Sequence, residues 1–146
     1  MKPAWPSSTT LPVQFRDIDA MGHVNNAVYL AWLEQARNSF YLEMLGRRDP
    51  FAKGLGLDFV VARAEADYLA PMHFGDVAEI TMWPVRVGGS SFTLDYDCRK
   101  QDGTAFLKAR TVLVAYDWEQ ARSKPLSDEL RALLQAGLGS GPWELS

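Results

Sequence analysis

One long segment with helical spacing, set among segments that alternate with a period of two, limits what this chain can fold into. Between residues 26 and 45, apolar side chains recur at intervals of three and four, as on one face of an α-helix. These residues are Tyr29, Leu33, Ala36, Phe40 and Met44. Four further apolar residues widen the face, namely Val28, Leu30, Trp32 and Tyr41. We therefore expect a helix that is largely enclosed and that ends near Gly46.

The other apolar segments predict strands. Residues 1–9 are expected to be a loose lead-in and residues 11–16 a first short strand. From residue 60 to residue 70 the pattern alternates, and one face is expected to carry Val60, Ala62, Ala64, Ala66, Tyr68 and Ala70. The small alanine side chains on that face would let the helix approach the strand closely.

Three more strands with tight turns follow. Residues 77–87 form an expected strand in which Pro84 indicates a sheet edge or a bulge. Gly88-Gly89 and Asp102-Gly103 predict hairpins on either side of the next strand. The last long strand is expected at residues 105–116.

The order of strand, long helix and four strands predicts an α+β fold. Its natural form is one five-stranded antiparallel sheet wrapped around the helix. A short C-terminal helix is expected at about residues 127–136, with Ser127 as its N-cap. All 146 residues are expected to form a single domain with its core at about residues 11–118.

Composition and charge argue against several classes of function. The formal net charge is −3 and the lysines and arginines form no basic run, so no nucleic-acid partner is expected. No segment approaches the roughly 18 apolar residues of a membrane span and none resembles a signal peptide, so we expect a cytoplasmic location. The single cysteine, Cys98, is expected to be a small buried side chain. The two histidines, His23 and His73, lack the spacing of a metal site, so we expect neither a metal nor another cofactor.

The segment between the first strand and the helix carries the candidate chemistry. Residues 15–29 place two carboxylates, Asp17 and Asp19, directly before a helix. A helix N-terminus exposes free N–H groups and a partial positive charge, which can polarise a carbonyl oxygen. A carboxylate just upstream could attack that carbonyl or activate a water beside it. The same residues also fit a structural interpretation, in which the aspartates shape the loop and Asn25 or Asn26 caps the helix.

A family resemblance favours the chemical interpretation. The loop contains the run Asp17-x-Asp19-x-x-Gly22-His23-Val24-Asn25-Asn26-x-x-Tyr29. This run resembles the signature of the hotdog-fold thioesterases related to 4-hydroxybenzoyl-CoA thioesterase. Two later segments are similar to weaker motifs of that family, namely Tyr68-x-x-Pro71-x-x-x-Gly75-Asp76 and Ser91-Phe92. The resemblance covers about residues 11–118 and implies a hotdog fold with acyl-CoA thioesterase activity.

The resemblance also implies roles for the residues of the motif. Asp19 matches the catalytic carboxylate, which acts as a nucleophile or as a general base. The backbone N–H of Asn26, helped by Asn25, would polarise the thioester carbonyl. Gly22 would permit a close approach of loop, helix end and substrate. His23 is a further catalytic candidate, with a structural role as the alternative.

Other residues are expected to bind substrate or to support the loop. Tyr29 would line the acyl pocket or serve only in packing, and Ser91 and Phe92 are further substrate-binding candidates. Asp17 is expected to hold the loop. The resemblance implies a homodimer whose sheets join edge to edge with each active site between subunits, or a homotetramer.

The expected substrate is an acyl thioester of CoA or of acyl carrier protein. In 4-hydroxybenzoyl-CoA thioesterase, a basic cluster on the hairpin before Ser-Phe meets the CoA phosphates. That hairpin here is Gly88-Gly89-Ser90, with only Arg86 nearby. Candidates for phosphate recognition elsewhere in the chain are Arg63, Arg99, Lys100, Lys108 and Arg110.

Two alternative functions remain open at this point. One is an enoyl thioester hydratase or dehydratase of the same fold, although Asp19 and His23 do not reproduce the usual acid and base pattern of those enzymes. The other is a non-catalytic protein that binds acyl thioesters. Acyl length, aromatic preference and pathway are not encoded in a readable motif.

Overall fold

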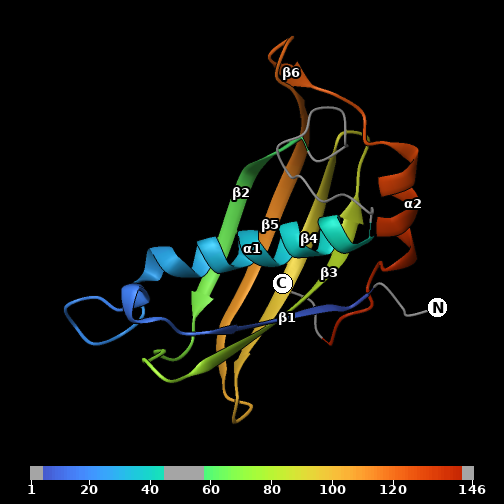
Figure 1. Ribbon diagram of the computed structural model, residues 1–146. Helices are drawn as coiled ribbons and strands as arrows, with labels where there is room; N and C mark the ends of the chain where they lie inside the picture. Colours follow the sequence, from blue (N-terminus) through green and yellow to red (C-terminus); the bar gives the residue numbers. More distant parts are fainter. Residues whose placement is uncertain (1–4, 45–57, 143–146) are drawn as a thin grey trace.

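The computed structural model describes residues 5–44 and 58–142 and shows a long helix lying across an antiparallel sheet (Figure 1). The strands follow the order β1-β3-β4-β5-β2, and the short β6 pairs with β5. The elements in chain order are β1 Ser7–Pro12, a 3-10 turn at Phe15–Asp17, α1 Asn26–Met44, β2 Phe59–Tyr68, β3 Val77–Val87, β4 Ser91–Lys100, β5 Ala105–Asp117, β6 Arg122–Ser123 and α2 Asp128–Ala136. The predicted helix on a five-stranded sheet is confirmed, with β6 as an addition.

Helix α1 packs on the sheet face that we call the inner face, which carries Leu94, Tyr96, Thr111 and Leu113. The buried stripe of the helix consists of Tyr29, Trp32, Leu33, Ala36, Arg37, Phe40 and Tyr41. Full burial of each large apolar side chain stabilises the fold by about 1.5–3 kcal/mol. The one cation of the stripe, Arg37, donates to the Tyr96 hydroxyl at 3.0 Å, and that hydroxyl lies 2.7 Å from the Thr111 hydroxyl. This network ties the middle of α1 to the sheet.

The expectation of a largely enclosed helix is wrong for the single chain. Ala27 and Ala31 are exposed, and Leu30 keeps 41% of its surface accessible. The buried positions are three or four residues apart and therefore cover only one side of α1. The opposite side is open, and the expected helix end at Gly46 lies outside the described residues.

The first strand begins earlier than expected. β1 spans Ser7–Pro12 instead of residues 11–16, so part of the expected lead-in belongs to the sheet. The serines and threonines of β1 show no alternation of apolar and polar side chains, although every second residue of the strand is partly buried. The hydroxyl of Ser8 lies 3.1 Å from the hydroxyl of Thr81 on β3. The chain leaves the sheet at Pro12 and enters the 3-10 turn at Phe15–Asp17.

In β2 the predicted alternation breaks at Ala62. Val61 pairs with Leu113 and Arg63 with Val112, so β2 has one residue more than β5 at this point. Such a bulge reverses which residues face each side of the sheet. The single face expected for residues 60–70 is therefore wrong, and the exposed Ala64 is not covered by α1.

The prediction for β3 is confirmed, including the effect of Pro84. A second bulge follows this proline, since Pro84 pairs with Leu94 and Arg86 with Thr93. β1 pairs with β3 only as far as Met82, and beyond it the Pro84 carbonyl accepts the N–H of Gly139 at 3.0 Å. A proline is tolerated there because its missing N–H leaves no ladder bond unmade.

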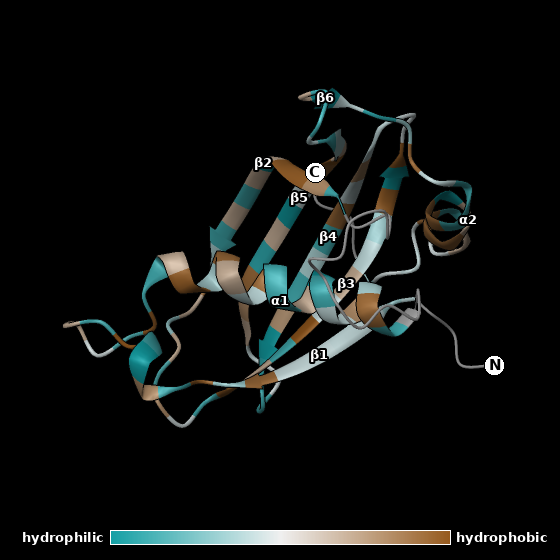
Figure 2. Cartoon of the chain, turned by 45° about the horizontal axis from the view of Figure 1, so that its top comes forward, coloured by the Kyte–Doolittle hydropathy of each residue, from teal (hydrophilic) through white to brown (hydrophobic). Residues whose placement is uncertain are grey.

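The predicted hairpins and the C-terminal cap also form. Gly88 N–H donates to the Ser91 carbonyl at 2.7 Å, and Gly103 adopts a φ of +88° in the turn from β4 to β5. The Ser127 hydroxyl accepts the N–H of Leu130 at 3.2 Å at the start of α2. Figure 2 shows hydrophilic and hydrophobic residues alternating along the strands that α1 crosses. In the described ranges, no helix is long and apolar enough to cross a membrane.

The connection from β2 to β3 is held by Asp76. Its carboxylate accepts the N–H of His73 at 2.9 Å and the side-chain amide of Gln101 at 3.1 Å, and it lies 3.6 Å from the Lys100 ammonium. Burial alone would raise the pKa of this carboxyl. The two donors and the charges of Lys100 and His73 outweigh burial, so the pKa of Asp76 is lowered.

We predict that Asp76→Asn lowers the free energy of unfolding at neutral pH by about 1–3 kcal/mol, because charge-assisted hydrogen bonds are lost. The contribution of the Asp76 carboxylate to the free energy of unfolding is complete above its unfolded-state pKa of about 3.9. It is lost as the pH falls through the lower folded-state pKa. Urea unfolding at neutral and successively lower pH measures this difference. The exposed-turn variant Glu119→Gln is the control, and a difference that does not shrink in acid would contradict the electrostatic cause.

We also predict that the Cys98 thiol is inert in the native protein. Cys98 is fully buried on β4, as expected from the sequence, and burial raises its pKa. Because the thiolate is the reactive form, a chromogenic disulfide reagent should react with one thiol only after unfolding in guanidinium. Reaction of the native protein at the rate of an unfolded sample would show that β4 is accessible.

Candidate active site

The loop between β1 and α1 is closed at both ends by Asp17. Its carboxylate accepts the N–H of Gln14 at 2.8 Å, and its carbonyl accepts the N–H of Asn25 at 3.0 Å. One bond anchors the 3-10 turn and the other anchors the residue before the helix. These contacts give Asp17 the supporting position that the sequence predicts.

Asp19 lies in this loop with an exposed side chain. One carboxylate oxygen, Oδ1, accepts the N–H of Met21 at 2.9 Å. The Asp19 N–H donates to the His23 carbonyl at 2.9 Å, and its own carbonyl accepts the N–H of Gly22 at 3.0 Å. The second carboxylate oxygen has no hydrogen-bond donor among the described residues, so it can face a reactant.

Gly22 serves the loop differently from the expectation of a close approach. A Cβ atom at this position would meet no atom within 4 Å, so space does not require glycine. The residue adopts a φ of +81°, which other L-amino acids reach only with strain. Gly22 therefore allows the turn that carries the chain from Asp19 back to His23.

The N-terminus of α1 presents one unused backbone donor. The Asn25 side chain accepts the N–H of Ala27 at 3.0 Å, and its carbonyl accepts the N–H of Val28 at 2.9 Å. Asn25 is thus the N-cap and Asn26 the first helical residue. Across the described chain no acceptor lies at the N–H of Asn26, which is the donor that the resemblance assigns to the oxyanion.

A cavity of about 260 Å³ opens beside this helix start. Its lining comes from the end of the loop, the first turn of α1 and the segment after β2, and consists of His23, Val24, Asn26, Tyr29, Tyr68, Leu69, Ala70 and Pro71. The Val24 N–H donates to the Met72 carbonyl at 2.9 Å and so holds the loop against that segment. Asp19 is not part of the lining and lies on the loop that borders it.

Two tyrosines give the cavity aromatic walls. Tyr29 is buried, and its ring centre lies 5.4 Å from that of Tyr68. Burial raises the pKa of the Tyr29 hydroxyl, a backbone hydrogen bond with Met72 lowers it, and the nearby Tyr68, Asp19 and Asp76 raise it further. Tyr29 is therefore a neutral hydroxyl at physiological pH. The Tyr68 hydroxyl lies 3.5 Å from the Asn26 carbonyl.

His23 meets a second histidine that the sequence did not connect with it. The rings of His23 and His73 are perpendicular, with centres 5.0 Å apart. The Nδ1 atom of His73 lies 3.8 Å from the carboxylate of Asp76. The sequence did not predict Tyr68 or His73 as site residues. Tyr68 begins the motif that ends at Asp76 and could have been found there, whereas fifty residues separate His73 from His23 and no sequence pattern connects the two.

Ser91 and Phe92 are not brought to this cavity within one chain. They begin β4 beside the hairpin with β3 (Figure 1), whereas the residues that line the cavity include Tyr68 at the other end of β2 and the segment just after it. Phe92 is buried and its ring packs edge-on against Phe59 at 5.3 Å. Arg131 of α2 donates to the carbonyls of Gly88 and Gly89 at 2.9 Å and so supports this hairpin.

The arrangement can support acyl transfer without a metal site. A carboxylate, a free helix N-terminal N–H and an aromatic cavity adjoin one another, which are the parts needed to attack a carbonyl and to stabilise its oxyanion. In residues 5–44 and 58–142, no group of three or more His, Cys, Asp or Glu side chains could hold a metal ion.

Comparison with known proteins gives the family. Residues 13–134 match the thioesterase-like superfamily. A 1,4-dihydroxy-2-naphthoyl-CoA hydrolase of Thermosynechococcus vestitus is 27% identical over 124 residues, 85% of each chain. A thioesterase of Thermus thermophilus, solved as a complex with coenzyme A and Zn, has a TM-score of 0.74 and 32% identity over 89% of this chain and 98% of that one.

A third protein supports the fold. The 1,4-dihydroxy-2-naphthoyl-CoA thioesterase of Synechocystis has a TM-score of 0.77 at 20% identity, over 88% of this chain and 95% of that one. Its identity is too low to carry function, but the shared fold agrees with the helix and the strand order seen here. The chain belongs to the thioesterase-like superfamily and is a thioesterase of the hotdog fold.

Proposed function

We propose that this protein hydrolyses acyl-CoA to a free carboxylic acid and CoA at the cavity beside the start of α1. The observation that carries the proposal is the unused N–H of Asn26, which lies at the cavity close to a carboxylate-bearing loop. A free N–H at a helix N-terminus stabilises the negative charge that develops on a thioester oxygen during attack. Asn25 supports this donor by capping the two N–H groups that follow.

Asp19 supplies the attacking function in this mechanism. As a general base it takes a proton from water while the water oxygen bonds to the thioester carbon, and the CoA thiolate leaves. As a nucleophile its carboxylate bonds to that carbon, expels the thiolate and forms an anhydride, which water then splits. Both routes give the same products, and both place the oxyanion at Asn26.

The cavity chemistry suggests an aromatic acyl group. Tyr29, Tyr68 and His23 present ring faces or edges to the cavity, and flat aromatic groups stack well on such walls. The names of the relatives also point to an aryl-CoA, since the Thermosynechococcus protein is a 1,4-dihydroxy-2-naphthoyl-CoA hydrolase. CoA is favoured over acyl carrier protein because a structural relative was solved with coenzyme A.

A second copy of the chain completes the proposed site. β2 pairs with β5 on one side, and its other edge has no partner strand in the described part of the chain. Exposed apolar residues lie along or just after this strand, with Val61 49%, Tyr68 47% and Leu69 49% accessible. We propose a homodimer joined at β2, with further assembly to a homotetramer, in which Ser91 of one chain serves the cavity of another and the buried Phe92 supports the start of β4 by packing. A cytoplasmic location stays a prediction of the sequence.

Replacement of Asp19 tests the catalytic carboxylate. Asp19→Asn should lower kcat roughly a hundredfold to ten-thousandfold with little change in stability, because the side chain is exposed. Thiol release from short, long and aromatic acyl-CoAs measures the rate and identifies the acyl class. The matched variant Asp17→Asn should lower the Tm and keep most of the turnover.

Three outcomes of this panel would change the assignment. Near-normal hydrolysis by Asp19→Asn would remove Asp19 from the mechanism. Conversion of an enoyl thioester to a hydroxyacyl product without thiol release would identify a hydratase. Tight binding without turnover, unchanged in Asp19→Asn, would identify a non-catalytic binder.

Two substitutions at Asn26 separate its side chain from its backbone N–H. Asn26→Ala should keep kcat within about tenfold of wild type. Asn26→Pro removes the N–H at the first helical position, where proline is structurally tolerated, and should lower kcat roughly a hundredfold to a thousandfold, since one oxyanion donor lowers the activation barrier by ~3 kcal/mol. Circular dichroism and Tm report whether α1 is intact, and equal kcat values for both variants would exclude this N–H as the oxyanion donor.

A further inference from the structure

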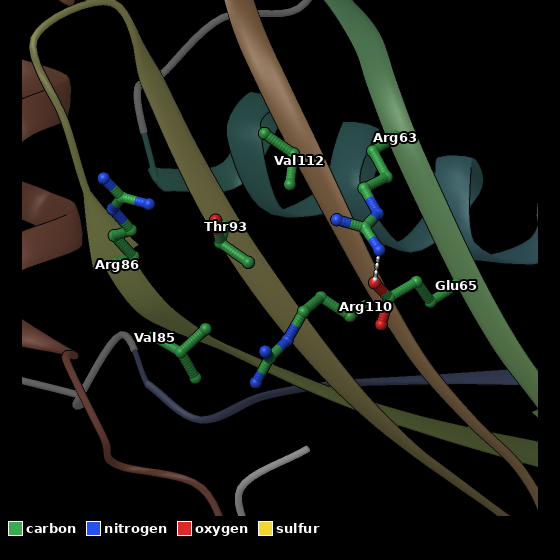
Figure 3. A pocket seen from close by; sticks show the side chains of 7 residues that line it. All are labelled: Arg63, Glu65, Val85, Arg86, Thr93, Arg110 and Val112. Carbon is green, nitrogen blue, oxygen red and sulfur yellow. Dashed lines mark ion pairs between the residues drawn. The ribbon is translucent and has the colours of Figure 1, made fainter. Parts of the chain in front are cut away.

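A second cavity lies on the outer face of the sheet, opposite the face that α1 covers. It has a volume of about 470 Å³ and is separate from the Asp19 site. The side chains around it come from four neighbouring strands and are Arg63, Glu65, Val85, Arg86, Thr93, Arg110 and Val112. Figure 3 shows these side chains on the near side of the strands, with the helix behind them.

Two bulges place two of the arginines on this face. In β2 the extra residue Ala62 separates Val61, which pairs with the inner-face Leu113, from Arg63, which pairs with the outer-face Val112. In β3 the extra residue Val85 separates Pro84, which pairs with the inner-face Leu94, from Arg86, whose partner is the outer-face Thr93.

Without the bulges, the regular alternation of side chains along β2 and β3 would turn both arginines to the inner face of the sheet. Val61 and Pro84 face inward, so without the bulges the second residue after each, Arg63 and Arg86, would also face inward, towards the core. Bulges re-aim side chains in this way and are often found beside functional sites. The same device acts on both flanks of one cavity.

The two arginines stand at the ends of one row across the sheet. The pairing runs from Arg63 to Val112, from Val112 to Thr93 and from Thr93 to Arg86. Three inter-strand spacings separate the ends by about 14 Å, with the shorter Val112 and Thr93 side chains between them. Long cationic side chains therefore flank a low floor, which includes the Thr93 hydroxyl.

The three arginines around the cavity differ in how they are paired. Arg110 forms a bidentate pair with the fully buried Asp95, at 2.6 and 3.0 Å. Arg63 lies 2.6 Å from Glu65, and 70% of its side chain is exposed. Within the described part of the chain, Arg86 is exposed and no acidic side chain pairs with it. Arg63 and Arg86 thus both present exposed guanidinium groups at the cavity.

We propose that this outer-face cavity binds a diphosphate group of an organic ligand, with Arg63 and Arg86 contacting it from opposite ends and Thr93 from below. Guanidinium groups match phosphoryl oxygens with paired hydrogen bonds. Because both arginine side chains are long and can lean inward over the shorter Val112 and Thr93, two linked phosphoryl groups can accept from both guanidinium groups, whereas a single carboxylate offers only one pair of oxygens. Arg110 lines one side of the cavity and is held there by Asp95.

Two sources could supply such a group. One is the diphosphate of a CoA thioester whose acyl end occupies the Asp19 site of another subunit, and this source rests on the proposed hydrolysis. The other is a separate diphosphate metabolite. The binding chemistry at Arg63 and Arg86 is the same for both.

Calorimetric titration with inorganic pyrophosphate tests the site and needs no turnover, so its result is independent of the proposed hydrolysis. Arg63→Gln and Arg86→Gln should each weaken pyrophosphate binding roughly tenfold or more, because a charge-assisted contact is lost. Arg122→Gln, at an exposed arginine of β6, is the matched control and should leave the Kd within about twofold. Binding should also weaken as salt is added.

Coenzyme A then distinguishes the two sources. If CoA displaces pyrophosphate and Arg86→Gln raises KM for acyl-CoA with kcat unchanged, the site holds the diphosphate of the substrate. If CoA does not displace bound pyrophosphate, the site serves a separate ligand. Absence of pyrophosphate binding, or equal binding by the wild type and both cavity variants, would overturn the proposal.

Discussion

The packing of one helical stripe on the inner face of the sheet determines where the chemistry can lie. The buried side chains of α1, from Tyr29 to Tyr41, allow one placement of the helix across the strands, and the contacts of Arg37 with Tyr96 and Thr111 fix its middle. The first turn of α1 then lies beside Tyr68, where β2 ends and the connection to β3 begins. The fold thereby places the N-terminus of α1 against a cavity, which is the position that the proposed mechanism requires of an oxyanion donor.

The loop before α1 is shaped mostly by its own backbone. Bonds from Asn25 to Asp17, from Asp19 to His23 and from Val24 to Met72 define its path, and each joins an N–H to a carbonyl. The side chains of Asp19 and His23 are exposed on this fixed backbone, whereas those of Asp17 and Asn25 hold the loop and cap the helix. At Gly22 the backbone itself sets the limit, because its positive φ restricts that position to glycine or a few tolerant residues.

Local patterns in the sequence predicted much of the fold. The extent of α1, the bounds of β3, both hairpins and the Ser127 cap each depend on residues close in sequence, such as spaced apolar side chains or paired turn glycines. β1 was misplaced because its Ser and Thr residues show no apolar alternation. The alternation expected in β2 failed because nothing in a sequence marks Ala62 as an extra residue, and the bulge appears only in its pairing with β5.

The site was predictable only where its residues are consecutive. Asp17, Asp19 and Asn25 could be placed from the order of loop and helix, whereas the contact of His23 with His73 depends on tertiary structure. The prediction that α1 is largely enclosed within its own chain was wrong for a similar reason. Apolar spacing indicates that a helix surface is to be covered, but it does not identify what covers it.

The bulges at Ala62 and Val85 also matter for how the gene can change. A point mutation at either codon alters one side chain, but loss of the codon removes the extra residue and restores strict alternation. The flanking residues then keep their faces, because Val61 and Arg63 already lie on opposite faces of the sheet, as Pro84 and Arg86 do, and neighbouring strand residues alternate. The alternation of both strands therefore tolerates loss of the extra residue, and a homologous chain that lacks it is aligned correctly across β2 or β3 only if a one-residue gap is placed at the bulge.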